Sequence, residues 1–212
     1  MNNKYKYKYI KYKTKYLNLI GGVQSNKDFA QYLADFMKQS GITNENYAII
    51  AGYCVAQITE RIVTDLDVIV SNDAYNKLLD IVNTNTNKDL QHGVTSISKT
   101  EKISLNTPHG EIEFFGRETT GFPSDEFSLR NLQKNKMLDY DTFNNPYLNT
   151  DTVIKIYSDV KKINNELILG DGHKINIERL QKNIKHLNEI NQILKRDDII
   201  DKINYLNDLI KT

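Results

Sequence analysis

The chain has 212 residues, 39% of them hydrophobic, and a formal net charge of +1. This length allows one domain of roughly 150 residues with a sizeable core and flanking segments. The balanced charge indicates no overall preference for nucleic acid or a membrane surface, and no apolar run approaches the ~18 residues that a transmembrane segment needs. A single cysteine, Cys54, excludes an internal disulfide, fits a reducing compartment, and is expected to pack in the interior rather than serve as a catalytic thiol.

Residues 1–22 are a low-complexity leader of lysine and tyrosine. They hold six lysines and no acid, so the rest of a chain with net charge +1 carries −5. The leader has three interpretations: a segment without a catalytic part, a basic amphipathic helix on an anionic surface, or a segment that stacks on single-stranded nucleic acid. It resembles the lysine-tyrosine leaders of giant DNA viruses of amoebae. This resemblance implies a viral protein in the host cytoplasm or virus factory, with packaging in the virion as a further expectation.

Residues 26–40 are predicted to form an amphipathic helix, ended by Gly41. The apolar residues follow the i, i+3, i+4 spacing of a helix that buries one face; they are Phe29, Tyr32, Leu33, Phe36 and Met37. We expect this stripe to belong to the core, and we assign it no function.

The strongest chemical pattern lies in residues 47–70. A buried apolar run at 48–50 leads to Gly52, where the missing Cβ lets a ligand approach the backbone. A short helix follows, and a second apolar run at 66–70 comes next. The stretch therefore predicts two buried strands joined by a small-residue turn and a helix.

Two aspartates, Asp65 and Asp67, stand one residue apart at the start of the second run. Because side chains alternate along a strand, both carboxylates would point to one side while Leu66 and Val68 point into the core. Carboxylates this close repel each other unless a cation lies between them, so the pattern indicates a divalent metal site. A solvated strand edge or turn is the alternative.

Further along, residues 71–82 predict a helix capped by Ser71 or Asn72. Short strands are expected at 94–98 and 103–105, followed by a strand at 110–115. The last of these carries more acids. Glu111 and Glu113 share one face, and either one would add a third carboxylate on a neighbouring strand to Asp65 and Asp67 beside a phosphate-sized turn, the layout that two-metal phosphoryl chemistry requires. His109 alternates with these glutamates, and a zinc site is the alternative interpretation.

The rest of the chain is expected to be a loop or hairpin followed by helices. Residues 116–149 are polar and rich in turn residues, and they are predicted to line the substrate side. Three helices follow: the first is capped by Thr150, the second has Leu180 and Leu187 on its buried face, and the third starts after Asp197 and Asp198. A tight turn is predicted at 170–172.

The glycine turn, the Asp-x-Asp pair and the third acid resemble the nucleotidyltransferase superfamily of the DNA polymerase β type, most closely its minimal and abortive-infection toxin-like branches. The resemblance covers roughly residues 26–195, with Ala51 and Gly52 in the place of the family's paired small residues. It implies an α/β (α+β) fold with a mixed sheet and flanking helices. The leader at 1–22 would precede a core at 23–148 and a helical subdomain at 149–212.

The resemblance also implies the chemistry. It makes the chain a metal-dependent enzyme that moves a nucleoside monophosphate from an NTP to a hydroxyl of RNA, protein or a small molecule. Asp65, Asp67 and Glu113 would be the catalytic acids and the ligands of Mg²⁺ or Mn²⁺, with Glu111 as the competing third acid. The residues expected to bind the nucleotide are Gly52, Tyr53, Arg61 and Lys155. The alternative is a catalytically inactive binding or virion-associated protein on the same fold, for which the altered turn at Ala51 would be the sign.

Overall fold

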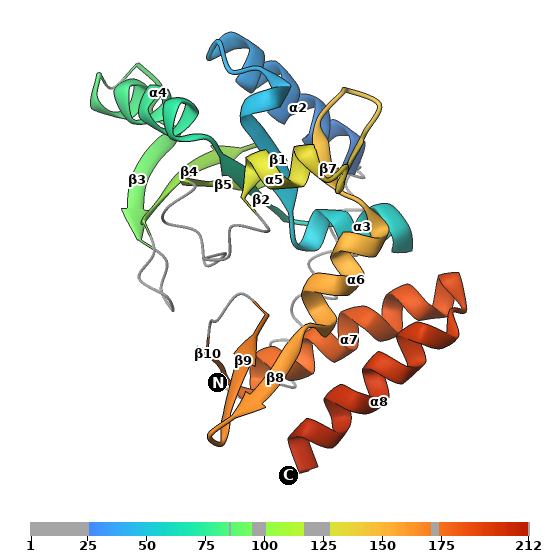
Figure 1. Cartoon of the computed structure of the whole chain (residues 1–212). Helices are drawn as coiled ribbons and strands as arrows, with labels where there is room; N and C mark the ends of the chain where they lie inside the picture. The colour runs from blue at the N-terminus through green and yellow to red at the C-terminus, as the bar shows by residue number, and fades with distance from the viewer. Residues whose placement is uncertain (1–25, 85, 95–100, 117–127, 171–173, 212) are drawn as a thin grey trace, which may run out of the picture.

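A computed structural model describes residues 26–84, 86–94, 101–116, 128–170 and 174–211. Over these residues the protein is a mixed α/β structure with a seven-stranded sheet and a separate three-stranded sheet, which confirms the predicted fold class. Figure 1 shows two helices above the large sheet and the C-terminal elements below it. The leader lies outside the described residues, so its interpretation stays a prediction.

The large sheet has the strand order β3-β4-β5-β2-β1-β7-β6. Its strands are β1 (Tyr47–Ile50), β2 (Asp65–Val70), β3 (Leu90–Val94), β4 (Glu101–Thr107), β5 (Gly110–Gly116), β6 (Leu138–Tyr140) and β7 (Pro146–Leu148). β2 pairs in parallel with β5, and β1 pairs in parallel with β7. The other neighbouring strands are antiparallel. The two acid-bearing strands are therefore direct neighbours in the middle of the sheet.

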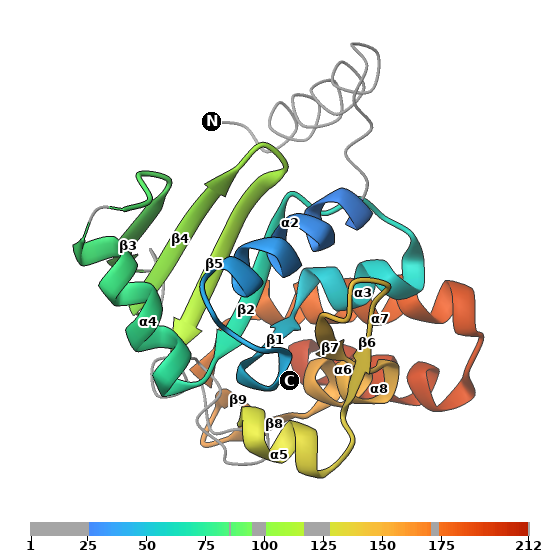
Figure 2. The ribbon, with the colours of Figure 1, turned by 90° about the horizontal axis from the view of Figure 1, so that it is seen from above.

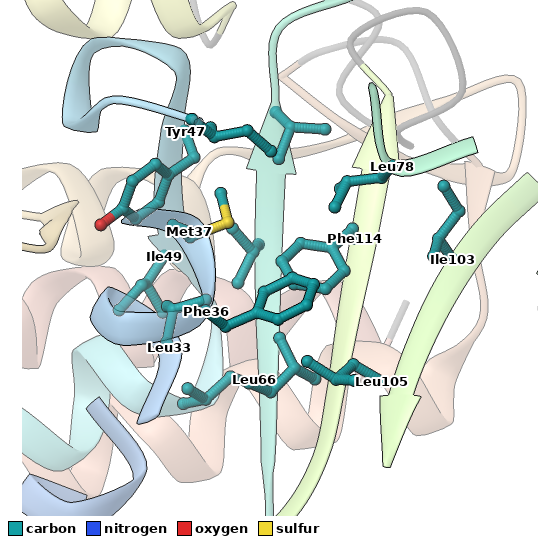
Figure 3. Packing of buried hydrophobic residues seen from close by; sticks show 14 of the residues in the cluster. Leu33, Phe36, Met37, Tyr47, Ile49, Leu66, Leu78, Ile103, Leu105 and Phe114 are labelled. Atoms are coloured by element: carbon teal, nitrogen blue, oxygen red, sulfur yellow. The ribbon is translucent and has the colours of Figure 1, made fainter. Parts of the chain in front are cut away.

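One face of the sheet is covered by α2 (Asn26–Gln39) and α4 (Asn72–Asn83). Figure 3 shows Leu33 and Phe36 of α2 packed against Leu66 and Phe114 of the central strands. The rings of Phe36 and Phe114 are stacked with their centroids 5.8 Å apart. The predicted helical stripe at 26–40 is thus confirmed as core, and the helix stops where Gly41 adopts φ +65°.

The opposite face meets the C-terminal helices. α3 (Gly52–Thr59), α6 (Thr150–Ser158), α7 (Ile177–Leu194) and α8 (Asp197–Lys211) form a second core with Ala48, Ile50 and Ile69 of the sheet. Figure 2 shows α7 and α8 side by side on this side of β1 and β2. Since Ile69 shares a face with Asp65 and Asp67, the acids lie on the face that the C-terminal helices partly cover.

The prediction that residues 149–212 are helical throughout is wrong between α6 and α7. A three-stranded sheet lies there, made of β8 (Val160–Ile163), β9 (Glu166–Leu169) and β10 (Lys174–Ile175). Asn164 and Asn165 join β8 to β9 with φ of 50° and 63°. Two successive residues with positive φ are what a type I′ hairpin turn needs, and asparagine tolerates this conformation. The Asn-Asn pair was the available sequence signal.

Several predicted boundaries shift. The strand expected at 94–98 occupies Leu90–Val94, and residues 95–98 lie outside the described part. The segment 116–149 contains the expected hairpin, β6 and β7, but also an unpredicted helix, α5 (Leu129–Lys134). Asn149, not Thr150, caps α6. Ser71 caps α4 as predicted. The turn expected at 170–172 falls largely on undescribed residues.

A one-turn 3-10 helix (Asn44–Asn46) leads from α2 into β1. None of the helices in the described part of the chain has the length and hydropathy of a membrane span.

Candidate functional site

The pairing of β2 with β5 places four carboxylates on one face of the sheet. Asp65 is the register partner of Glu111, and Asp67 is the register partner of Glu113. Register partners on neighbouring strands lie about 4.8 Å apart and project to the same side. The residues that alternate with them are fully buried on the other side: Leu66, Val68, Ile112 and Phe114. The structure therefore brings Asp65, Asp67 and Glu113 together, with Glu111 beside them.

We define the acidic cluster as Asp65, Asp67, Glu111 and Glu113; in it Asp65 is exposed, whereas Asp67 is half-buried. Burial raises the pKa of Asp67 to about 6, and the charges of Asp65 and Glu113 add to the effect. These neighbours make the ionised form of Asp67 costly, and a cation that bound there would remove the cost.

Two cations on α7 act on Asp67 in the opposite direction. The positive charges of Lys182 and Arg179 lower its pKa, although they do not cancel the rise. Both side chains are exposed, and they flank Leu180, which is buried in the second core. The sequence interpretation missed them, because they lie more than 100 residues from Asp67. The available sequence signal was that Arg179 and Lys182 lie next to the buried apolar face of the helix predicted around Leu180.

Lys102 of β4 was also missed. On β4, Ser104 faces Glu113 and Asn106 faces Glu111, so Lys102 shares their face two residues earlier. Its ammonium forms ion pairs with Glu113 and, at 3.5 Å, with Glu111.

Burial lowers the pKa of Lys102, but its hydrogen bond to Glu113 and the charges of both glutamates outweigh this, so the pKa is raised. The alternation of polar Lys102, Ser104 and Asn106 with the buried Ile103 and Leu105 was the available sequence signal.

The zinc interpretation is wrong about the position of His109. This residue lies in the turn between β4 and β5, and its ring packs against Phe29 and Tyr32 of α2 with centroid distances of 6.2 and 5.9 Å. α2 covers the face opposite the acidic cluster. Gly110, with φ +138°, interrupts the alternation that the interpretation assumed.

Next to the acids, β1 turns sharply into α3. Ala51 caps the helix with φ 56° and ψ −124°, a conformation that L-residues other than glycine rarely adopt. The turn therefore has the backbone of a glycine position but carries an alanine. Gly52 follows as the first residue of α3, and its missing Cβ leaves the guanidinium of Arg61 3.5 Å from where that atom would lie.

Replacing Ala51 with glycine is expected to raise the free energy of unfolding by about 1 kcal/mol, since relief of the strained φ exceeds the entropy cost of glycine. Urea denaturation in EDTA measures it. Ala34→Gly in the middle of α2 is the matched control, and it should lower stability by about 1 kcal/mol. Equal losses in both variants would show that the turn is not strained.

The side chain of Tyr53, one of the residues expected to bind the nucleotide, lies in the core. It is 2% exposed, its hydroxyl donates to Asp141 Oδ2 at 2.9 Å, and its ring contacts Tyr147 edge-on. Burial and the Asp141 charge raise its pKa far above the usual range. Any contact of Tyr53 with a nucleotide would therefore come from its backbone N–H. Lys155 lies on the exposed side of α6, next to the buried Ile154.

Arg61 joins the turn to α7. Its Nη2 donates to the Gly52 carbonyl at 3.3 Å, and its Nη1 donates to Glu189 Oε2 at 3.0 Å. The same Nη1 lies 3.3 Å from His186 Nδ1. Burial, together with the Arg61 charge, lowers the pKa of His186 to about 4, so this imidazole is neutral at pH 7 and can accept a hydrogen bond from Arg61. Arg61 thereby fixes α7, and with it Lys182, relative to Gly52.

Arg61→Met is expected to lower the free energy of unfolding by about 2 kcal/mol, because Glu189 and the Gly52 carbonyl each lose a charged donor. Chemical denaturation at pH 7.5 checks this. Lys185→Met serves as the control, since Lys185 also pairs with Glu189, at 3.7 Å, but is 67% exposed. A surface pair contributes little, so the control should change stability by less than about 0.5 kcal/mol. Similar losses of stability in the two variants would contradict the claim that Arg61 stabilises the fold more than a surface ion pair does.

Within the described ranges, no group of three or more His, Cys, Asp or Glu side chains is already arranged as a ligand set for a metal ion. The acids share a face, but Glu113 is bonded to Lys102. Comparison of the chain with models of known protein families and with curated protein sequences found no match.

Proposed function

We propose that the protein is a metal-dependent nucleotidyltransferase that moves a nucleoside monophosphate from an NTP to the hydroxyl of an acceptor, which is RNA, a protein or a small molecule. The observation that carries the proposal is the register of β2 and β5, which sets Asp65 and Asp67 beside Glu111 and Glu113 on the sheet face opposite α2 and α4. The resemblance to the nucleotidyltransferase superfamily of the DNA polymerase β type supports it.

The donor set suits Mg²⁺ or Mn²⁺, since hard divalent cations prefer carboxylate oxygens. Burial is the largest cause of the raised pKa of Asp67, the charges of Asp65 and Glu113 add to it, and shifts of this kind are common at functional sites. Asp65, Asp67 and Glu113 would hold the ion. A divalent cation held there would supply positive charge against the nucleotide phosphates and would acidify the acceptor hydroxyl.

The other residues divide by charge. Lys182 and Arg179 lie on the side of the cluster where α7 passes, and their exposed cations can bind the triphosphate oxygens. The backbone N–H groups at the start of α3, beginning at Gly52, can donate to the same phosphates. Glu113 would orient the acceptor hydroxyl and take its proton, and Arg61 would position the phosphate-binding elements.

The test is transfer of label from each NTP, with Mg²⁺ or Mn²⁺, to a pool of RNA and proteins. Wild type is compared with Asp67→Asn, and with Asp80→Asn on the exposed side of α4 as the matched control. Transfer that Asp67→Asn abolishes and Asp80→Asn preserves supports the proposal. If no NTP binds in a metal-dependent manner at millimolar concentration, the protein is instead the catalytically inactive module, which the alanine at position 51 would then explain.

A further inference from the structure

Lys102 has an unusual position for a surface lysine. It lies on β4 at the edge of the acidic cluster, and its ammonium pairs with both Glu111 and Glu113. Its side chain is 18% exposed, against 43% for Glu111, so the ammonium lies among the carboxylates rather than in open solvent. A cation is thus present in the cluster without any metal.

The contact with Glu113 affects how the acids can be used. Glu113 is the register partner of Asp67 on β2, yet its carboxylate is bonded to Lys102 on β4, the strand on the other side. The carboxylate oxygens that accept from an ammonium are the same atoms that would bind a metal ion. Four acids share this face, no ready ligand set is found among the described residues, and the carboxylate of Glu113 is already engaged by Lys102.

We propose that Lys102 is a built-in counter-cation, which occupies the acidic cluster in the metal-free protein and must release Glu113 before a divalent cation can bind there. The inference depends on the proposed function, because it assigns the metal to Asp65, Asp67 and Glu113. Lys102 neutralises part of the carboxylate charge when no metal is bound, and the free energy needed to break its ion pair with Glu113 lowers the metal affinity of the site. Lys102 is a positioning residue, since it acts on Glu113.

Direct contact distinguishes Lys102 from the cations of α7. Lys182 also acts on the cluster, because its charge lowers the pKa of Asp67. It lies on α7, however, and not on a strand of the sheet. Removing either lysine removes one positive charge near the cluster. Only removal of Lys102 would also free Glu113, so the two substitutions separate occupancy of the site from its general electrostatic field.

The experiment is a titration of the EDTA-treated, desalted full chain with Mn²⁺, followed by electron paramagnetic resonance. Lys102→Met should bind Mn²⁺ about tenfold more tightly than wild type, the value of one charged hydrogen bond. Lys102→Arg keeps the charge and should stay within about twofold of wild type, and Lys182→Met should gain no more than about threefold. Lys88→Met, on an exposed loop, should change nothing. The rise in melting temperature on adding Mn²⁺ is a second readout, and it should be largest for Lys102→Met.

The outcomes separate this inference from the proposed function. If wild type binds Mn²⁺, Asp67→Asn abolishes the binding, and Lys102→Met gains no more than Lys182→Met, then the role of Lys102 is overturned while the metal site stands. If neither wild type nor Lys102→Met binds Mn²⁺ at millimolar concentration, both fall, and the contact of Lys102 with Glu113 is a structural ion pair. Tighter binding by Lys102→Met alone supports both.

Discussion

Asp67→Asn is expected to abolish nucleotide transfer and, at the same time, to make the metal-free protein more stable above pH 6. Asparagine has nearly the same shape but no charge. Loss of a carboxylate from the proposed metal site should reduce transfer on the order of 10³-fold, equivalent to about 4 kcal/mol of transition-state stabilisation. The label-transfer assay with purified variants measures this part of the prediction.

The stability gain follows from the pKa of Asp67, which burial and the neighbouring carboxylates raise from 3.8 to about 6. The folded state therefore holds a proton that the unfolded state releases, and the contribution of Asp67 to stability is complete only below pH 3.8. It is lost as the pH rises through 6, where the ionised carboxylate costs about 3 kcal/mol as an upper value. The asparagine variant escapes this loss.

Urea denaturation in EDTA at pH 4 and pH 7.5 checks the sign. The difference between Asp67→Asn and wild type should be small at pH 4 and favour the variant by about 2 kcal/mol at pH 7.5. Asp80→Asn should show no such pH dependence. If Asp67→Asn is the less stable protein at pH 7.5, Asp67 has a structural rather than a functional role.

Gly110→Ala is expected to lower the free energy of unfolding by more than about 3 kcal/mol. Gly110 starts β5 with φ +138°, which an alanine does not tolerate. An added Cβ would also overlap the carbonyl oxygen of Thr64 and lie 2.9 Å from its carbonyl carbon. That carbonyl accepts a hydrogen bond from the N–H of Glu111 at 3.3 Å. The clash would therefore disrupt the hydrogen bond at the start of the pairing between β5 and β2.

Gly93→Ala is the matched control for Gly110→Ala. Gly93 lies in β3, where a Cβ would meet no heavy atom within 4 Å. This substitution should leave stability within about 0.5 kcal/mol of wild type. Because the register of β5 also aligns Glu113 with Asp67, the Gly110 variant should lose Mn²⁺ binding even under conditions where it remains folded. Equal stability of the two variants would contradict the close approach of Gly110 to Thr64.

The features that depend on local periodicity could be predicted from the amino-acid sequence. Alternation in 65–70 and 110–115 placed the acids on the face opposite Leu66 and Phe114, and the 3.6-residue spacing identified α2. Both follow from backbone geometry within a single element. The Asn164-Asn165 turn between β8 and β9 is also a local signal in the sequence, although it was not used for the prediction.

Which elements contact each other could not be predicted from local patterns and became visible in the folded chain. The parallel pairing of β2 with β5, the arrival of Lys102 from β4, and the approach of Lys182 on α7 join residues distant in the chain, and no periodic pattern encodes such pairings. The same holds for Arg61, whose guanidinium bonds Glu189 of α7. Contacts of this kind depend on how whole faces of helices and sheets pack, so many residues together determine them. The side of the sheet to which each carboxylate points, in contrast, is set by alternation within its own strand.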